Sequence, residues 1–242
     1  MLNKSNYSIG FWCQFIDHFS IRNICNLNYD WIALDMEHGV YDYKDIAYLS
    51  NLIKSYKKIT MVRLKLSTEI EVQRCLDNGA DGLILPMIDD PLKLQKLILK
   101  TMYPPKGSRS VGYSSSNNFG LDLNLDIKSK FKPFIVIQIE NKKGIENLEK
   151  LININGVDAI MVGPYDLSAS LGCPGQFKNK KFLDCLEIVN KTLSNSKVYK
   201  GYHIVKPDEK ELKSKIKSGY KFIAYGTDGT FINSKFSLPN TV

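Results

Sequence analysis

Two stretches of the sequence each hold an apolar run that is followed by a carboxylate: residues 134–140, F-I-V-I-Q-I-E, and residues 158–168, D-A-I-M-V-G-P-Y-D-L-S. The carboxylates are those of Glu140 and Asp166. Such runs are typical of strands buried on both faces, as in parallel sheets. A carboxylate at the end of a buried strand is costly unless a cation or a positive partner lies close. Two of them on successive strand ends come side by side, so Glu140 and Asp166 are candidate ligands for Mg²⁺ or Mn²⁺. The alternative is that each merely caps the following helix.

Apolar, β-rich segments alternate with stretches of helical periodicity along the whole chain. Several of these helical stretches end in glycine just before the next strand, as at D-N-G-A-D-G. This alternation predicts a (β/α)8 barrel, a TIM barrel, as one domain over residues 1–242. A doubly wound sheet is the second choice, because no glycine-rich first turn follows an early strand. The expected strands are Ile9 to Phe15, Trp31 to Asp35, Ile59 to Leu64, Gly82 to Met87, Phe134 to Glu140, Ala159 to Gly163, Tyr199 to Val205 and Lys221 to Gly226.

Composition excludes several other classes of protein. The chain has 242 residues, of which 43% are hydrophobic and 24% charged, as in ordinary globular domains. It lacks a signal-peptide pattern and any apolar run near the roughly 20 residues of a membrane span, so no membrane partner is expected. The 5 cysteines are widely spaced without a C-x-x-C pair, which predicts reduced thiols in a cytoplasmic protein. The net charge of +8 comes from lysines at helical spacing with no nucleic-acid module, so no nucleic-acid partner is expected.

Two regions depart from the alternation. Residues 103–120 form a long segment rich in Pro, Gly, Ser and Asn between the fourth and fifth strands. Irregular loops of this length tend to be functional, so its tip is expected to act as a lid, with a plain surface insertion as the alternative. Only residues 231–242 remain near the C-terminal end, so the last helix is expected to be short or missing.

Active sites of (β/α)8 barrels lie at the C-terminal ends of the strands. Polar side chains gather at these ends here: Asp35, Glu37 and His38 in L-D-M-E-H-G, Arg63 and Lys65 in M-V-R-L-K, and Gln138 beside Glu140. A histidine next to two acids at a strand end, as His38 is, favours proton transfer over a structural role. Lys65 shares the strand face of Arg63, so a Schiff base with the substrate is a rival mechanism.

The chain resembles the HpcH/HpaI aldolase/citrate lyase family, the metal-dependent class II pyruvate aldolases. The resemblance covers nearly the whole chain and rests on six ordered motifs: D-W-I-A-L-D-M-E-H-G, M-V-R, G-A-D-G-L-I-L-P-M-I, Y-P-P-K-G-S-R-S-V-G, V-I-Q-I-E and G-V-D-A-I-M-V-G-P-Y-D-L-S. It implies a (β/α)8 barrel of the phosphoenolpyruvate/pyruvate type that forms homo-oligomers. It also implies a divalent ion, Mg²⁺, Mn²⁺ or possibly Co²⁺, held by Glu140 and Asp166.

The same resemblance implies roles for other residues. Asp35 and His38 match a His–Asp pair that moves protons, and Arg63 matches an arginine that stabilises an enolate. Asp77 matches an aspartate near a subunit boundary. The residues expected to contact substrate are Gln138, Gly163, Pro164, Tyr165 and His203, the last replacing an apolar residue.

The implied activity is that of a metal-dependent aldolase, a carbon–carbon lyase acting on small molecules. It forms or cleaves 4-hydroxy-2-oxoacids through a pyruvate enolate, with a sugar-derived aldehyde as the expected acceptor. Two other interpretations stay open. One is a citrate-synthase-like or acyl-CoA lyase with the same enolate chemistry, and the other is a catalytically silent barrel that acts as a binding module.

Overall fold

The computed structural model describes residues 6–124 and 132–235. Eight parallel strands close into a barrel in the order β1 to β8, which confirms the (β/α)8 fold and makes the doubly wound alternative wrong. Each expected strand is present, with ends shifted by a residue or two. The strands are β1 Ser8–Cys13, β2 Trp31–Asp35, β3 Ile59–Arg63, β4 Gly82–Leu85, β5 Phe134–Ile139, β6 Ala159–Val162, β7 Tyr199–Ile204 and β8 Phe222–Tyr225.

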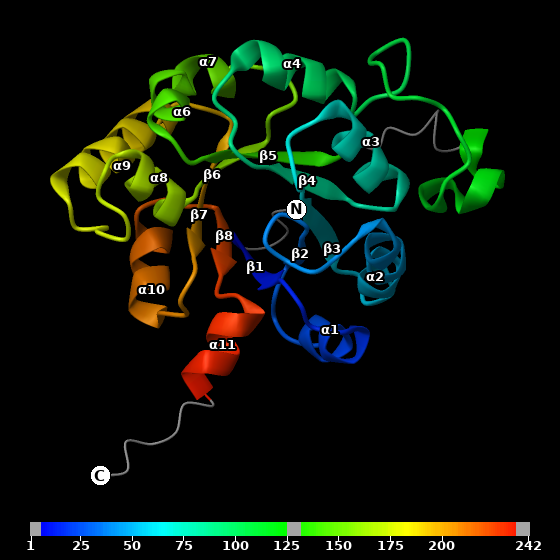
Figure 1. Ribbon diagram of the computed structural model, residues 1–242, viewed down its shortest axis with the longest axis horizontal. Coiled ribbons are helices and arrows are strands. Elements are labelled where there is room, and N and C mark those ends of the chain that lie inside the picture. The colour runs from blue at the N-terminus through cyan, green and yellow to red at the C-terminus, as the bar shows by residue number, and fades with distance from the viewer. Residues whose placement is uncertain (1–5, 125–131, 236–242) are drawn as a thin grey trace.

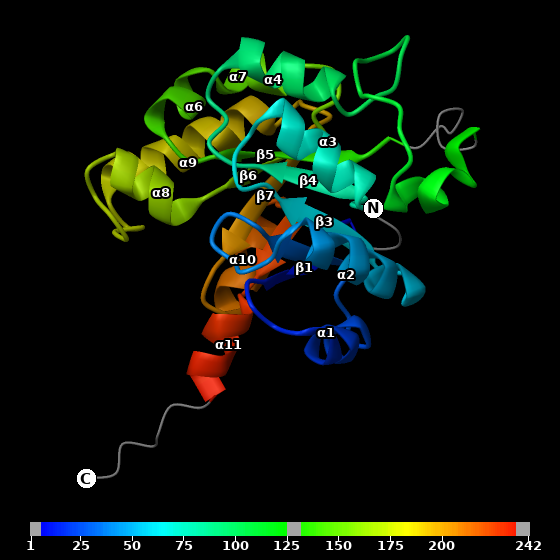
Figure 2. The same cartoon turned by 45° about the vertical axis from the view of Figure 1, so that its right-hand side comes forward.

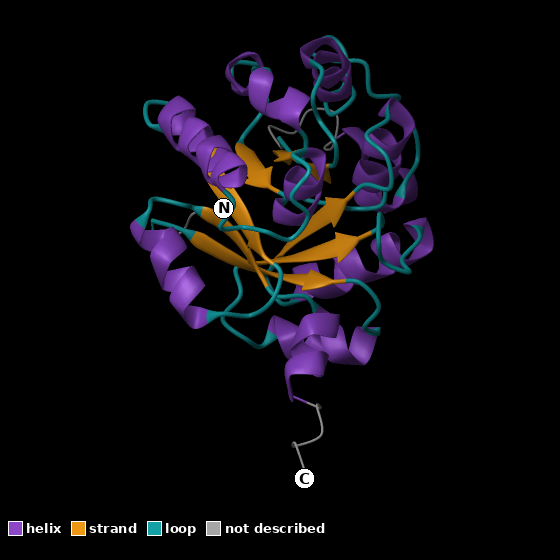
Figure 3. Cartoon of the chain, turned by 60° about the vertical axis from the view of Figure 1, so that its left-hand side comes forward, coloured by secondary structure: helices purple, strands orange, loops and turns teal. Residues whose placement is uncertain are grey.

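Helices surround this ring of strands on the outside (Figures 1, 2 and 3). Most begin at an Asp, Asn or Thr whose side chain accepts a backbone N–H of the first turn, as Asp42 does for α2. The helices are α1 His18–Cys25, α2 Tyr43–Ser55, α3 Glu69–Asp77, α4 Pro91–Leu99, the 3-10 helix η1 Ser115–Gly120, α6 Lys142–Glu146, α7 Leu148–Ile152, α8 Pro164–Ser170, α9 Lys180–Leu193, α10 Glu209–Lys217 and α11 Asp228–Lys235.

The inside of the barrel is a packed core, because alternate residues of each strand point inward. The rings of Trp31 and Phe222 stack there with centroids 4.3 Å apart and planes 2° from parallel. Gly10 faces the Trp31 ring, and a Cβ atom at position 10 would lie 2.1 Å from ring carbons of Trp31. The absence of a side chain at Gly10 therefore leaves room for the Trp31 ring inside the barrel.

The segment 103–120 does not cover the C-terminal ends of the strands. It follows α4, so it belongs to a helix-to-strand connection, and such connections leave a barrel at the end opposite the active site. Its η1 packs beside α3 on the outside of the barrel. The expectation that its tip forms a lid on the site of the same chain is therefore wrong.

The remaining expectations about the chain have mixed outcomes. The last helix, expected to be short or missing, is present as the 8-residue α11, next to β8 (Figure 1). All five cysteines are free and buried. Within residues 6–124 and 132–235, every helix is too short or too polar to cross a bilayer.

We predict that Gly10→Ala destabilises the barrel, because the added methyl group would overlap the buried Trp31 ring. Overpacking of this kind costs about 1–3 kcal/mol, measurable as a lower free energy of unfolding in urea. Gly112→Ala is the matched control, since a Cβ atom at position 112 meets nothing within 4 Å. Equal free energies of unfolding for the two variants would contradict this account of the contact between Gly10 and Trp31.

Candidate active site

A cavity of about 340 Å³ opens at the C-terminal ends of the strands. Its walls hold nine of the residues expected from the sequence: His38, Arg63, Gln138, Glu140, Gly163, Pro164, Tyr165, Asp166 and His203. It is also lined by five residues that were not expected there: Trp12, Gln14, Val205, Thr227 and Thr230. The barrel thus brings together side chains from both ends of the chain, including all the expected metal ligands.

Asp35 ends β2 and forms a buried ion pair with Arg63, which ends β3. The two residues are register partners in neighbouring strands. Arg63 donates from Nε to Oδ1 at 2.8 Å and from Nη2 to Oδ2 at 2.5 Å, a two-pronged contact that fixes the guanidinium plane. Asp35 is fully buried and Arg63 is 6% exposed, so the pair is shielded from water.

The Asp35 carboxylate also accepts hydrogen bonds from other elements. Trp12 Nε1 donates to Oδ2 at 3.1 Å and Gln14 Nε2 donates to the same oxygen at 3.2 Å. Burial alone would raise the pKa of Asp35, but the hydrogen bonds and charge of Arg63, with those of Trp12, lower it below the ordinary value. Asp35 is therefore an anion that holds Arg63, Trp12 and Gln14 in place at the C-terminal ends of the strands.

The loop after β2 carries Glu37 and His38. Glu37 Oε2 lies 2.9 Å from Arg63 Nη1, so the guanidinium lies between two carboxylates. Burial would lower the pKa of Arg63, yet Asp35 and Glu37 together raise it. Burial also raises the pKa of Glu37, with the charge of Arg63 acting against the rise.

His38 is attached to Asp35 differently from what the sequence suggested. Asp35 Oδ1 accepts the backbone N–H of His38 at 3.2 Å and that of Glu37 at 3.0 Å. In the described residues no bond joins the Asp35 carboxylate to the His38 imidazole. Asp35 thus anchors the loop through its backbone, and His38 is among the residues that line the cavity.

Glu140 follows β5 and is 3% exposed. Its Oε2 accepts the backbone N–H of Met87 at 2.9 Å. Met87 has φ of 52°, an uncommon conformation for a residue other than glycine. Burial raises the pKa of Glu140 to about 7, and the Met87 N–H only partly offsets this. Among residues 6–124 and 132–235, no cationic side chain forms an ion pair with this buried carboxyl group.

Asp166 lies in the first turn of α8, which begins directly after β6. Gly163 is the residue before this helix and provides no side-chain cap. A Cβ atom at position 163 would lie 2.6 Å from Glu140 Oε1, so only glycine lets Glu140 and the start of α8 come together. Two carboxylates and an uncapped helix start therefore share one wall of the cavity.

Two polar atoms beside the cavity have no hydrogen-bond partner among the described residues. They are Gln138 Oε1 on β5 and His203 Nε2 on β7. The His203 ring stacks on Trp12 with centroids 4.4 Å apart, and the Arg63 guanidinium carbon lies 5.0 Å from the Trp12 ring centroid. Burial and the Arg63 charge lower the pKa of His203 to about 3, so this imidazole is neutral.

Asp228, just after β8, positions the loop that follows β1. It is not among the residues predicted from the sequence. Its Oδ2 accepts the backbone N–H groups of Gln14 at 2.7 Å, Phe15 at 2.9 Å and Ile16 at 3.2 Å. This joins the loop after β1 to the end of β8 and holds Gln14 toward Asp35. The rule that selected Glu140, a carboxylate just beyond a buried strand, would also have selected Asp228.

Two other candidates lie away from the cavity. Strand β3 ends at Arg63, so Lys65 is in the following loop, exposed, with Nζ 5.7 Å from the Tyr43 ring centroid. No lysine is among the residues described as lining the cavity, which removes the geometric basis of the Schiff-base mechanism. Asp77 ends α3 and pairs with Arg109 Nη2 at 2.6 Å within the same chain. Its place at a subunit boundary stays a prediction.

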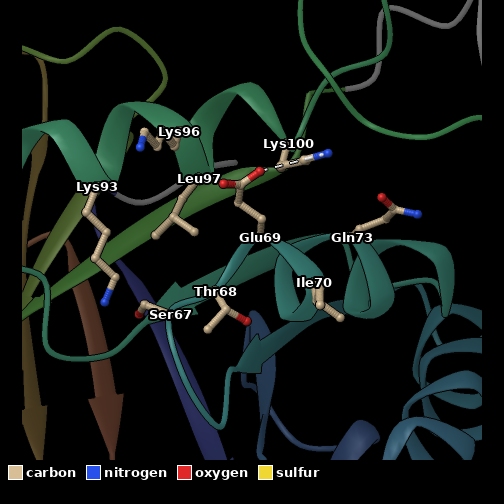
Figure 4. Close-up of a pocket in the computed structure, with 9 residues that line it drawn as sticks. All are labelled: Ser67, Thr68, Glu69, Ile70, Gln73, Lys93, Lys96, Leu97 and Lys100. Atoms are coloured by element: carbon tan, nitrogen blue, oxygen red, sulfur yellow. Dashed lines mark ion pairs between the residues drawn. The ribbon is translucent and has the colours of Figure 1, made fainter.

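A larger cavity of about 540 Å³ lies between α3 and α4, outside the barrel (Figure 4). Its charged groups are the lysines of α4 and Glu69, which is 3.9 Å from Lys100. The buried Ser67 hydroxyl in its wall already donates to the Pro86 carbonyl at 2.5 Å. This hollow therefore offers solvated lysines rather than converging reactive groups, and we place the site in the smaller cavity.

We predict that Asp35→Asn strongly destabilises the protein, because it leaves the buried Arg63 without its main counter-charge. Breaking one side of a buried pair costs about 3–5 kcal/mol, to be measured as the free energy of unfolding. Asp184→Asn is the control, because Asp184 pairs with Lys180 at 2.9 Å on the exposed surface of α9. Such surface pairs contribute below about 1 kcal/mol. A loss no larger than that of the control would disprove the role of the pair.

Comparison with known proteins accords with this geometry. The chain is 28% identical over 229 residues to the hydroxypyruvate/pyruvate aldolase of Roseobacter denitrificans, covering 94% of this chain and 89% of that protein. It is 27% identical to the 2-keto-3-deoxy-L-rhamnonate aldolase of Shigella dysenteriae, covering 94% and 85%. A crystal structure of an HpcH/HpaI aldolase/citrate lyase family protein from Burkholderia cenocepacia matches with a TM-score of 0.89 at 25% identity, covering 96% and 93%. The model of that family matches residues 8–234, so the chain belongs to the HpcH/HpaI aldolase/citrate lyase family.

Proposed function

We propose that the protein is a metal-dependent pyruvate aldolase, which forms or cleaves 4-hydroxy-2-oxoacids through the enolate of pyruvate. The observation that carries this proposal is the cavity wall formed by Glu140 and Asp166, with Arg63 in the same cavity. Membership of the family and the named aldolases among its relatives support it. A cavity of about 340 Å³ suits small substrates such as a 2-oxoacid and a short aldehyde.

The residues present fit a divalent ion. Glu140 is buried, and its Oε1 lies on the Gly163 side, where Asp166 also faces the cavity. No group of three or more His, Cys, Asp or Glu side chains within residues 6–124 and 132–235 forms a closed metal site. Mg²⁺ and Mn²⁺ commonly use one or two carboxylates and leave other positions for water and substrate, so two ligands suffice; Co²⁺ is a further candidate. The ion would act as a Lewis acid on the oxygens of the 2-oxoacid.

The protein groups around it would bind and orient the 2-oxoacid. Gly163 leaves the first turn of α8 uncapped, so the N–H groups of Tyr165 and Asp166 are suited to the substrate carboxylate. The Gln138 amide would contact the same substrate from β5. Arg63, fixed by Asp35, would hold a permanent positive charge at the oxygen that becomes negative when the enolate forms.

His38 is the group best placed to move a proton. Its imidazole lines the cavity while its backbone is tied to Asp35. A histidine in this position can remove a proton from the methyl group of pyruvate or return one to the enolate. Asp35 would then act on catalysis through Arg63 and through the position of the loop, rather than by contact with the imidazole.

The test is exchange of the pyruvate methyl protons in D₂O, followed by NMR with Mg²⁺ or Mn²⁺ and then with a chelator. We expect exchange that requires the metal and falls by at least about a hundredfold in Glu140→Ala, Asp166→Ala and His38→Ala. His18→Ala is the control for His38→Ala, since His18 lies on α1 outside the cavity. Full metal-independent exchange, or normal rates in both carboxylate variants, would overturn the proposal.

The raised pKa of Glu140 predicts pH-dependent metal binding. A carboxyl group with a pKa of about 7, raised by burial, still holds its proton at lower pH, and the metal must displace that proton. The affinity for Mn²⁺ should therefore fall about tenfold per pH unit below 7 and level off above it. Titration calorimetry measures this. The exposed variant Glu146→Gln should keep the pH profile, whereas a wild-type affinity that does not change with pH would contradict the prediction.

We also propose that the protein works as a homo-oligomer in the cytoplasm. Exposed apolar side chains on the loops and first turns after β3 and β4 support a subunit contact: Leu66 is 67% exposed, Ile70 71% and Leu92 68%. Five free, buried cysteines support a reducing compartment. Sedimentation analysis of the purified protein tests the first point, and a monomer at all concentrations would refute it.

A further inference from the structure

The N-terminal end of the barrel, opposite the active site, carries a repeated pattern of carboxylates. An aspartate stands directly before each of β2, β4 and β6, and its side chain accepts a backbone N–H from the second residue of the preceding strand. The pairs are Asp30 with Ile9 at 2.7 Å, Asp81 with Thr60 at 2.9 Å and Asp158 with Ile135 at 2.9 Å. Each aspartate also donates its own N–H to the carbonyl of the same partner residue. Three pairs of strands are thus joined at this end in the same way.

The fourth pair of strands, β7 and β8, departs from this pattern. Lys221 stands directly before β8, and its N–H donates to the carbonyl of Lys200, the second residue of β7, at 2.8 Å. The backbone arrangement is therefore that of the other three pairs, with a lysine in place of the aspartate. A lysine side chain has only donors, so it cannot accept the Lys200 N–H as a carboxylate does. The exchange leaves donors and positive charge where the other pairs have an anion.

A hollow of about 450 Å³ lies at this place, between the end of α9, the start of β7 and the residues before β8. Lys197, Lys200 and Lys221 line it, and none of the residues described as lining it is acidic. Among residues 6–124 and 132–235, no Asp or Glu forms an ion pair with any of these three lysines. The stretch 178–221 contains 12 lysines and five acids, so most of the net charge of +8 belongs to this part of the chain. The hollow is therefore a concave, positively charged surface.

Lys200 is held in place in the hollow rather than extended into solvent. Its Nζ donates to Asn190 Oδ1 at 2.8 Å and to the Ser218 carbonyl at 2.6 Å, and it lies 4.4 Å from the Tyr220 ring centroid. An ammonium group has three N–H donors, so one remains for a ligand. Burial lowers the pKa of Lys200, and no carboxylate among the described residues opposes this. An anion in the hollow would supply the missing counter-charge.

The hollow between α3 and α4 also contains lysines, but it differs in two respects. Its wall includes Glu69, whose carboxylate lies 3.9 Å from Lys100. Its other lysines, Lys93 and Lys96, are exposed side chains on one helix (Figure 4). That hollow is therefore partly neutralised and its lysines are solvated. The hollow before β7 and β8 instead combines a lysine fixed by hydrogen bonds with a wall that lacks acids.

We propose that the hollow before β7 and β8 is a second binding site, whose ligand is a small molecule that carries a phosphate group. A phosphate monoester brings nearly two negative charges and three acceptor oxygens, whereas a carboxylate brings one charge and two oxygens. Three lysines without acidic partners suit the larger charge, since lysine binds phosphate as a point charge. The Asn190 amide and the Ser196 hydroxyl in the wall add N–H and O–H donors. The site is independent of the proposed aldolase reaction, because it lies at the opposite end of the barrel.

Titration calorimetry of the full chain tests this site with three probes: inorganic phosphate, glycerol 3-phosphate and uncharged glycerol. Ionic strength is held constant, and a chelator removes metal from the active-site carboxylates so that no ion there can bind the probes. We expect saturable binding of one or both phosphates with a Kd of about 1 mM or tighter, and no binding of glycerol. Tighter binding of glycerol 3-phosphate assigns the ligand to the phosphate esters, whereas equal or weaker binding assigns it to free phosphate.

The decisive variant is Lys221→Asp, which restores the aspartate of the other three pairs. We expect it to weaken phosphate binding by at least about tenfold, because it removes one charge-assisted contact and adds a like charge. Its free energy of unfolding should not fall below that of the wild type, since aspartate can accept the Lys200 N–H. Lys200→Gln, which removes a charge without adding one, should weaken binding as well. Lys93→Asp is the matched control, because it makes the same change of charge in the hollow between α3 and α4, and it should change the Kd by less than about twofold.

Lysine footprinting locates the bound phosphate. Brief acetylation with and without phosphate, followed by mass spectrometry, should show protection of Lys197, Lys200 and Lys221, while Lys93 and Lys96 are labelled equally in both samples. No saturable phosphate binding, equal weakening in Lys221→Asp and Lys93→Asp, or protection spread evenly over all lysines would overturn the proposal. Metal-dependent proton exchange on pyruvate should be the same in the wild type and Lys221→Asp, so this outcome is distinguishable from that of the aldolase test.

Discussion

The ion pair between Asp35 and Arg63 is the interaction on which the arrangement of the site depends. Burying two charges is costly, and one carboxylate can be kept there only if its oxygens are well hydrogen-bonded. The partners come from several elements: the Arg63 side chain on β3, Trp12 and Gln14 at the end of β1, and two N–H groups of the loop after β2. Each partner is also a component of the site or holds one. Satisfying a single buried anion therefore sets the positions of the arginine, the tryptophan and the loop that carries the histidine.

Glu140, which follows β5 three strands further on, shows the opposite solution to the same problem. Asp35 has the Arg63 cation in contact and its pKa is lowered. Glu140 accepts the Met87 N–H, with no further partner among the described residues, and burial raises its pKa to about 7. The difference is in the environment, since both are carboxylates at the ends of inner strands. Asp35 is structural, because Arg63 already balances its charge. The charge of Glu140 is not balanced by a cation in this way, so its carboxylate remains available to a metal ion.

Much of this fold was predictable from the sequence, and the reason is physical. Strands buried on both faces need continuous apolar runs, and polar residues at their ends are rare enough to be noticed, which is how Glu140 and Asp166 were found. Details that depend on where a strand stops were less predictable: Lys65 lies two residues after Arg63, but β3 ends between them and the lysine turns outward. The bond of Asp35 to the backbone of His38, instead of its imidazole, leaves no trace in the sequence. Nor does the contact of Asp228 with the loop after β1, because it joins residues at opposite ends of the chain.

The two walls of the cavity, one from β5 and β6 and the other from β7 and β8, differ in their chemical groups. The wall from β5 and β6 holds the carboxylates of Glu140 and Asp166, the glycine that lets Glu140 meet α8, and the start of that helix. The wall from β7 and β8 holds a neutral imidazole whose ring is fixed by Trp12, and Trp12 is fixed by Asp35. The Asp35–Arg63 ion pair is thus connected through Trp12 to this second wall of the cavity as well.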